Sequence, residues 1–174
     1  MFDPAAVVKA AKSGQSVWIR SLSTLDDHPE PFSMFAPSDE VRSLVDAIPA
    51  VDQESPPVGV HIRRTDSVQS ISNSPMSAFE RLIDAEISSN SDQRFFVATD
   101  DPDSFRHLQE RYGDAVSEYP KRSYARNDPK GVVDAAVDFW ALTQCRKIFG
   151  SFYSSFTMTA AEAGGAELVM ALEE

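Results

Sequence analysis

The sequence predicts an α/β protein: a three-layer α/β/α sandwich around a mainly parallel sheet, Rossmann-like in the broad sense. Three observations predict this fold. Segments with the pattern of strands alternate along the chain with segments that have the pattern of helices. The main strand segments are continuous apolar runs, which are typical of strands covered on both faces. The connections are short, and this favours parallel βαβ units with helices on both faces of the sheet.

The first half of the chain supplies two strands and two helices. SVWIRSL at 16–22 is a short run of β-branched and aromatic residues, and VGVHIRR at 58–64 is an apolar run. A helix is expected over 38–48, where Ser38 is placed to cap and two acidic residues follow at the positive end of the helix dipole. A second helix is expected over 74–90, where large apolar residues recur at helical spacing.

The second half continues the alternation from RFFVATD at 94–100, which is again an apolar run. A helix is expected over 101–113, because Pro102 stands near its start and Gly113 at a natural C-cap. The remaining elements are a strand at 115–119, a helix at 131–145, a strand at 147–152, a helix at 154–165 that ends in glycines, and a strand at 166–172. The order of the strands in the sheet is not indicated by these patterns.

Length and composition limit the class of protein. The 174 residues suit one domain, with residues 1–57 as an N-terminal strand, helices and loops and residues 58–174 as a Rossmann-like core. A net charge of −11 argues against nucleic acid or an anionic membrane surface as a partner. No apolar run approaches the roughly 18 residues of a membrane span, and no signal peptide is recognised. The single cysteine, Cys145, lies in an apolar pattern as a small core residue, and a cytoplasmic location is expected.

Polar residues follow three of the expected strands. HIRRTD, residues 61–66, ends the first central strand, Asp100 and Asp101 end the next, and GSFYSS, residues 150–155, ends a later one. Ligands of open parallel sheets bind beyond the carboxyl ends of the strands, so we expect these side chains to gather at one edge. The guanidinium groups of two arginines match the geometry of phosphate. Serines at the start of a helix offer backbone N–H groups and hydroxyls to the same phosphate. Carboxylates beside them can accept hydrogen bonds from ribose hydroxyls or from the N–H groups of guanine. The pattern favours a nucleotide or a nucleotide sugar.

Structural roles are open for the same residues. Arg63, Arg64 and Asp66 could form an ion-pair cluster, one of the two consecutive aspartates could cap a helix, and the serines could be turn and cap residues. Asp138 lies on an apolar helix face, and His61 is either a packed core residue or a ligand contact. No GxGxxG, P-loop, HExxH or GxSxG motif is present, nor a His/Cys cluster with zinc spacing.

Three segments resemble the motifs of a known family. GVHIRRTD at 59–66 is similar to the first motif of the fucosyltransferase superfamily, which includes the α1,6-fucosyltransferases, the rhizobial nodulation fucosyltransferases and the protein O-fucosyltransferases. FFVATDDP at 95–102 resembles the second motif and VDFWALTQCRKIFGSFYSSFTMTAA at 137–161 the third. The resemblance implies the C-terminal, donor-binding half of a GT-B-type inverting glycosyltransferase that uses GDP-fucose, or another GDP-sugar, and no essential metal.

The resemblance also implies a donor site. It assigns the guanine to His61 and Asp138 and the nucleoside to Asp100 and Asp101. It assigns the diphosphate to Arg63, Arg64 and Ser155, with Ser154 close by. Without a metal, a cationic fork such as that of Arg63 must stabilise the departing GDP.

Two features depart from the family pattern. The α1,6-enzymes have a lysine directly after the motif aspartate and a glutamate a few residues later, both tied to catalysis, and Ser67 and Ile71 stand there in this chain. Asp66 is the fallback candidate for the general base. The roughly 57 residues before the first motif are too few for the N-terminal Rossmann-like domain that helps to build the acceptor side.

Three functions stay open at this point. The chain is a glycosyltransferase acting on an unknown glycan or protein acceptor, a truncated or non-catalytic module that binds GDP or GDP-sugar, or a degenerate α/β scaffold. A homodimer or a partner domain could replace the absent acceptor half.

Overall fold

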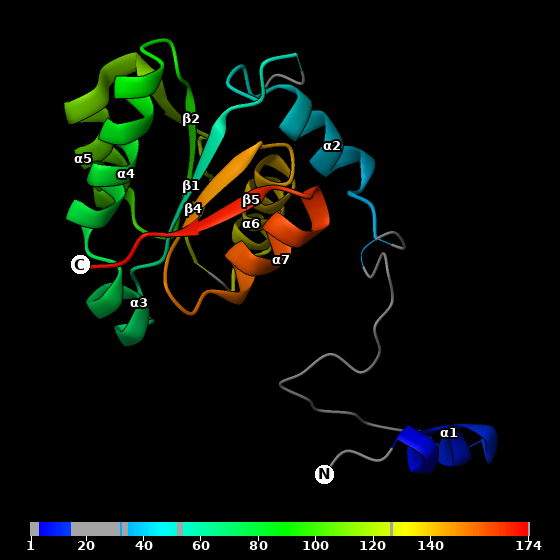
Figure 1. The fold of residues 1–174 in the computed structure, drawn as a ribbon. Helices are drawn as coiled ribbons and strands as arrows, with labels where there is room; N and C mark the ends of the chain where they lie inside the picture. The colour runs from blue at the N-terminus through cyan, green and yellow to red at the C-terminus, as the bar shows by residue number, and fades with distance from the viewer. Residues whose placement is uncertain (1–3, 15–31, 33–34, 52–53, 126, 174) are drawn as a thin grey trace. The chain divides into compact units, whose positions relative to one another are not determined.

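The computed structural model describes residues 4–14, 32, 35–51, 54–125 and 127–173 and separates two units, Met1–Met34 and Phe35–Glu174. The first unit contains helix α1 (Pro4–Lys12), and the second contains the sheet and the other helices (Figure 1). The strand expected at 16–22 lies outside the described residues. The single domain expected over 1–174 therefore stays a prediction.

The second unit is built on a five-stranded parallel sheet in the order β3-β2-β1-β4-β5. Its strands are β1 (Val58–Ile62), β2 (Phe95–Thr99), β3 (Val116–Glu118), β4 (Lys147–Gly150) and β5 (Glu167–Met170). The chain moves outward from β1 to β3 and then returns to place β4 on the other side of β1. The order of strands therefore reverses between β1 and β4, which is the topological switch point where such sheets bind ligands.

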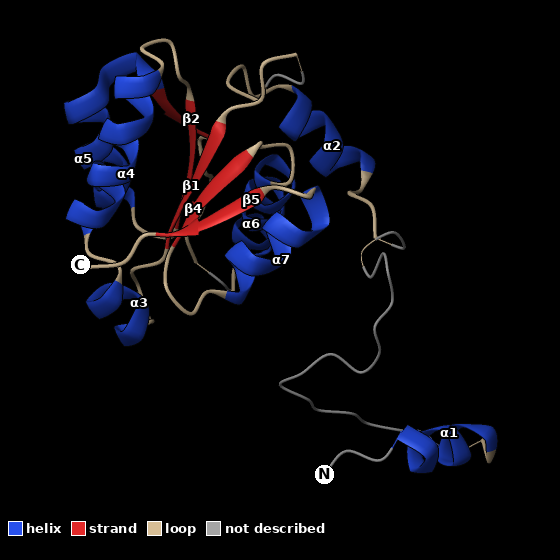
Figure 2. Cartoon of the chain, viewed as in Figure 1, coloured by secondary structure: helices blue, strands red, loops and turns tan. Residues whose placement is uncertain are grey.

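Helices cover both faces of this sheet, as the sequence predicted. They are α2 (Asp39–Asp46), α3 (Val68–Asn73), α4 (Met76–Ser89), α5 (Pro102–Tyr112), the 3₁₀ turn η1 (Gly113–Ala115), α6 (Pro129–Leu142) and α7 (Ser155–Gly164). Figure 2 shows α4 and α5 on one face and α2, α6 and α7 on the other. The three-layer α/β/α fold is confirmed. The sequence patterns did not indicate α3, which is a single short helix between β1 and α4.

The helix ends follow the signals in the sequence. The Ser38 side chain accepts a hydrogen bond from Val41 N and caps α2. Asp101 caps α5 by accepting from Ser104 N at 3.1 Å. Helix α7 ends at Gly165, whose φ of +67° lies in the left-handed region that favours glycine.

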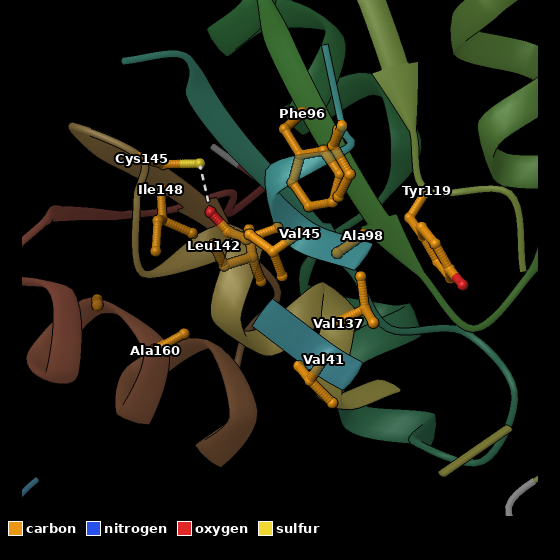
Figure 3. Close-up of a cluster of buried hydrophobic side chains, with 13 residues drawn as sticks. Val41, Val45, Phe96, Ala98, Tyr119, Val137, Leu142, Cys145, Ile148 and Ala160 are labelled. Carbon is orange, nitrogen blue, oxygen red and sulfur yellow. Dashed lines mark hydrogen bonds between the residues drawn. The ribbon is translucent and has the colours of Figure 1, made fainter. Parts of the chain in front are cut away.

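Each face of the sheet has its own apolar core. Because strand side chains alternate, Val58, Val60 and Ile62 pack under α4 and α5, whereas Gly59 and His61 face α6 and α7. A Cβ at Gly59 would lie only 2.8 Å from Leu142 Cδ2, so this strand position must stay small for α6 to pack closely. Figure 3 shows the core on the α6 face.

Cys145 belongs to the same core. It is 3% exposed, its Sγ contacts the Ala141 carbonyl oxygen at 3.5 Å, and burial raises its pKa to about 12. The thiol is therefore protonated and packed, as the sequence predicted for a small core residue.

Candidate functional site

A cavity of about 310 Å³ lies at the carboxyl end of the sheet, on the α6 side of the switch point. The cavity is lined by the ends of β1 and β2, the loop 119–125 after β3, residues 131–138 of α6 and the first turn of α7. Its lining residues are His61, Arg63, Thr99, Asp100, Lys121, Ser123, Tyr124, Ala125, Gly131, Val132, Ala135, Asp138 and Phe156. Four of the predicted site residues therefore meet in one cavity: His61, Arg63, Asp100 and Asp138.

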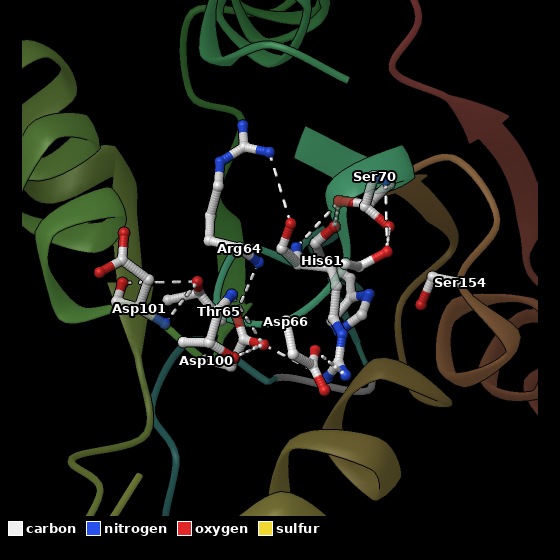
Figure 4. A network of polar contacts seen from close by, with 12 residues as sticks. His61, Arg64, Thr65, Asp66, Ser70, Asp100, Asp101 and Ser154 are labelled. Atoms are coloured by element: carbon white, nitrogen blue, oxygen red, sulfur yellow. Dashed lines mark hydrogen bonds and ion pairs between the residues drawn. The ribbon is translucent and has the colours of Figure 1, made fainter. Parts of the chain in front are cut away.

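Asp100 connects the end of β2 to the loop after β1. Its carboxylate accepts from Arg64 N at 2.7 Å and from Thr65 Oγ1 at 2.7 Å (Figure 4). Partial burial opposes its ionisation, but these hydrogen bonds and the charge of Arg63 outweigh burial and lower its pKa. Asp100 therefore fixes the backbone that presents Arg63.

Arg63 is the cation of the cavity. Its backbone N donates to Ser151 Oγ at 2.9 Å, which joins the end of β1 to the end of β4. Its guanidinium lies 3.2 Å from Asp100 Oδ2 and 2.5 Å from Asp66 Oδ1. The predicted gathering of three strand ends at one edge is confirmed by these contacts.

The ion pair between Arg63 and Asp66 is the weaker of the two. The Asp66 side chain is 53% exposed, so solvent screens its charge, whereas that of Asp100 is 19% exposed. Solvent screening therefore weakens the attraction of Arg63 for Asp66 more than its attraction for Asp100.

The Arg64 side chain takes a different direction. Its Cζ lies 5.8 Å from the ring centroid of Phe79, a residue of α4, and Arg64 is not among the described residues that line the cavity. Figure 4 shows it extending away from Asp66 and Asp100. The structure does not bring the two guanidinium groups together, and a phosphate contact by Arg64 stays a prediction.

The two serines and Asp101 serve helix ends. Ser154 is buried and accepts from Thr157 N at 3.4 Å as the cap of α7, and Ser155 is the exposed first residue of that helix. Asp101 caps α5. Of the α7 residues, Phe156 reaches the cavity wall, and the helix start beside it offers N–H groups that suit an anion.

His61 is held as a neutral ring. Its Nδ1 lies 2.5 Å from Thr157 Oγ1, and its ring stacks on Phe156 with centroids 4.9 Å apart. Burial lowers its pKa to about 4. His61 is packed in the core and also lines the cavity, and its contact with a ligand stays a prediction.

Asp138 forms a buried charged cluster with two residues near β3. Its Oδ2 lies 3.1 Å from Lys121 Nζ, and Glu118 Oε2 lies 3.7 Å from the same ammonium. Burial raises the pKa of Asp138 to about 7, although the Lys121 charge opposes this. Asp138 Oδ1, Lys121 Nζ and Glu118 Oε2 have no hydrogen-bond partner among the described residues.

The loop 119–125 is fixed over α6 by two features. Asp134 is fully buried and accepts from Arg122 N at 2.6 Å and from Ser123 N at 3.1 Å. A Cβ at Gly131 would collide with the Ala125 carbonyl oxygen, so only glycine lets the loop lie this close. In the sequence these residues lie between the expected strand at 115–119 and the expected helix at 131–145, and no motif indicated their part in the cavity. A lysine and a tyrosine within them were the available signal.

Two kinds of site are not found in the described ranges. None of their helices combines the length and the apolar character that crossing a bilayer requires. No group of three or more His, Cys, Asp or Glu side chains in those ranges is arranged to hold a metal ion.

Comparisons with known proteins give a likeness in structure only. No protein-family model and no curated protein sequence matches the chain. A crystal structure of the fucosyltransferase NodZ from Bradyrhizobium is similar with a TM-score of 0.50 and 21% identity, over 70% of this chain and 41% of NodZ. Two further structures of NodZ α1,6-fucosyltransferase are also similar. The structure co-crystallised with GDP has a TM-score of 0.49 and 21% identity, over 71% of this chain and 41% of that chain. The structure soaked with GDP-fucose has a TM-score of 0.49 and 21% identity, over 72% of this chain and 42% of that chain.

The likeness bears on the fold and spans less than half of NodZ. The parallel sheet, the helices on both faces and this likeness agree with the fold that the sequence motifs implied. The chain therefore has a glycosyltransferase-type α/β fold that resembles part of the fucosyltransferase NodZ.

Proposed function

We propose that this cavity binds the nucleoside diphosphate of a GDP-linked sugar, with GDP-fucose as the first candidate. The observation that carries the proposal is the presence of Arg63 and Asp138 in one cavity at the switch point of the sheet. A guanidinium fork fits a diphosphate, and a carboxylate with a buried oxygen free of hydrogen bonds suits the N–H donors of guanine. Phe156 and Tyr124 add aromatic wall on which a base can lie.

The anionic end of such a ligand would lie at Arg63 and near the start of α7. The diphosphate replaces Asp66 as the partner of the guanidinium, and Asp100 continues to hold the Arg63 backbone in place. The helix dipole at Ser154 and Ser155 adds a favourable field for negative charge.

Sugar transfer to an acceptor is the fuller form of the proposal. Arg63 would stabilise the negative charge of GDP as it leaves, and Asp66 would act as general base on the acceptor hydroxyl. The exposure of Asp66 suits access to an acceptor. No metal takes part in this scheme, and the acceptor class is open.

A second candidate, a module that binds GDP or GDP-sugar without transfer, is favoured by the residues after Asp66. Ser67 caps α3, and its Oγ lies 2.7 Å from Ser70 Oγ, so this position has a structural role. Ile71 is an exposed apolar residue. Neither side chain can move a proton in the way that the lysine and glutamate of the resembling enzymes would.

Calorimetry with GDP and GDP-fucose tests the binding step. We expect Arg63→Ala to weaken both ligands by at least about tenfold, because charge-assisted hydrogen bonds contribute about 1.5–3 kcal/mol. Asp66→Asn should strengthen GDP binding, since it removes the carboxylate that competes for Arg63. Arg106→Ala is the control, because Arg106 is an exposed arginine of α5 outside the cavity.

The outcomes separate the two candidates. Absence of binding at millimolar ligand would overturn the proposal, and an unchanged affinity in Arg63→Ala would overturn the phosphate assignment. Release of fucose to water or to acceptors, lost in Asp66→Asn while GDP still binds, supports the transferase. Binding without any turnover across a broad acceptor panel supports the module.

A further inference from the structure

We infer that Lys121 is a specificity-determining residue that reads the 6-oxo group of the guanine beside Asp138, an inference that rests on the proposed function. Lys121 lies in the loop 119–125 after β3 and lines the cavity together with Asp138 on α6. No sequence motif discussed above includes Lys121. The inference concerns the choice of base, whereas Arg63 concerns the phosphates.

The donor and acceptor groups of the pair match those of guanine. Lys121 Nζ is a donor and lies 3.1 Å from Asp138 Oδ2, an acceptor, and Asp138 Oδ1 is a second acceptor. The pairing edge of guanine carries an acceptor (O6), a donor (N1–H) and a donor (N2–H₂) in that order. A guanine placed against the pair would therefore accept from Lys121 and donate to Asp138.

Adenine presents the opposite order on that edge. Its N6–H₂ donor would face the Lys121 ammonium, and its N1 acceptor would face a carboxylate oxygen. Two repulsive contacts would replace two attractive ones, and buried polar groups left unpaired in this way discriminate strongly between ligands.

Burial increases the effect of these contacts on the free energy of binding. The Lys121 and Asp138 side chains are only 5% and 7% exposed, and Lys121 Nζ is paired with Asp138 Oδ2 at 3.1 Å. Asp138 Oδ1 has no hydrogen-bond partner among the described residues. An unpaired buried polar atom is costly, so a base that donates to Oδ1 removes that cost. Glu118 Oε2, 3.7 Å from Nζ, keeps a carboxylate beside the ammonium when Asp138 engages the base.

The walls around the pair suit a flat ring. Lys121 Nζ lies 5.7 Å from the ring centroid of Tyr124, and Phe156 lines the same cavity while stacked on His61. One aromatic ring therefore lies beside the pair and another lines the same cavity, and either can stack on a base.

A purely structural ion pair is the competing explanation. It would make Lys121 matter for stability but not for the choice among nucleotides. The ratio of affinities for different bases distinguishes the two, because a general loss of structure weakens every nucleotide alike.

The test compares GDP, IDP and ADP in calorimetric titrations of the whole chain at about pH 8, above the pKa of about 7 of Asp138, so that both of its oxygens are acceptors. The chains compared are the wild type, Lys121→Met and Lys121→Arg. The wild type should bind GDP much more tightly than ADP. Lys121→Met keeps the length of the side chain and loses the donor, so its affinity for GDP and IDP should fall by about tenfold or more with ADP unchanged or improved. Lys121→Arg keeps a cationic donor and should retain the preference for GDP.

Inosine diphosphate (IDP) separates the contact at the 6-oxo group from the contact at the 2-amino group. It keeps the 6-oxo group and lacks the 2-amino group, which faces Asp138 alone in this arrangement. The GDP-to-IDP ratio should therefore be the same in the wild type and in Lys121→Met.

Two results would overturn the inference alone: unchanged GDP affinity in Lys121→Met, or an equal loss for all three nucleotides. If Lys121→Met does not fold, the wild-type affinities for GDP and ADP test the inference. Equal affinities for the two nucleotides would contradict a pair that selects guanine. If the wild type binds none of the three, the proposed function itself fails and the inference with it.

Discussion

At the residue scale, two buried titratable groups of the cavity oppose each other in their effect on stability. Burial lowers the pKa of His61 to about 4 and raises that of Asp138 to about 7. Both groups are therefore held toward their neutral forms, one as a free imidazole and the other as a carboxylic acid near neutrality. The charged groups that act on His61 are Asp100, Arg63 and Lys121, and those that act on Asp138 are Lys121, Glu118 and Asp134.

The two groups predict pH effects of opposite sign. Asp138 is protonated in the folded chain up to about pH 7 but ionises from about pH 4 when unfolded, so its contribution to stability falls as pH rises from 4 to 7. His61 must take up a proton on unfolding below pH 6.5, so its contribution is lost as pH falls from 6.5 to 4. In the wild type the two effects offset each other.

Single variants should reveal each effect in denaturant titrations from pH 4 to 9. The unfolding free energy of Asp138→Asn minus that of the wild type should increase from pH 4 to 7 by up to about 1.4 kcal/mol per pH unit and level off above. For His61→Asn, the wild-type advantage should shrink as pH falls below 6.5. Differences that do not vary with pH would show that neither pKa is shifted by folding.

At the element scale, the close approach of α7 to β4 positions the cavity wall. Gly150 ends β4, and a Cβ there would overlap the Cγ2 methyl of Thr157 on α7. The same threonine holds His61 through its Oγ1. One close contact between a strand and a helix therefore fixes both the start of α7 and the orientation of the His61 ring.

This contact predicts that a second substitution, at Thr157, restores stability lost by a substitution at Gly150. Gly150→Ala should destabilise the chain by about 1–3 kcal/mol, the usual cost of overpacking. Thr157→Ser removes the methyl and keeps the hydroxyl for His61, so the double variant should recover most of that loss. Thermal unfolding of the two single variants and the double variant measures the coupling, and strictly additive losses would contradict a direct clash.

At the scale of the whole molecule, the apolar core that the structure describes begins at Val41. Among the described residues, every buried member of the two apolar clusters lies at Val41 or later in the chain. Helix α2 belongs to that core, because Val41 and Val45 pack in the same cluster as Val137 and Leu142 of α6. The core is thus larger than the segment 58–174 in which the three motifs lie.

Two truncated chains test this division. A chain that starts at Phe35 should unfold cooperatively and at nearly the same temperature as the full chain, because no described core residue is lost. A chain that starts at Val58 lacks α2 and exposes the apolar face of α6, so it should melt much lower or aggregate. Equal melting of the two truncated chains would show that α2 contributes nothing to the core.

The sequence by itself determined the local structure and the edge of the sheet at which the polar residues gather. Apolar runs without alternation predict buried parallel strands, and Ser38, Asp101 and Gly165 mark helix ends through interactions within a few residues. The polar residues after β1, β2 and β4 predict a common edge, because parallel strands end on the same side. These features depend on neighbours in the chain, and a single sequence therefore contains them.

Only the tertiary structure decided which of those residues share the cavity. Arg63 and Arg64 are adjacent in sequence, yet successive side chains near a strand end point to opposite faces, and Arg64 lies over Phe79. Lys121 joins Asp138 because Asp134 of α6 holds the loop 119–125 that follows β3, a contact between distant segments that the sequence does not indicate. Pairings between distant segments depend on packing across the whole core, and this is why the base-reading pair became visible only in the folded chain.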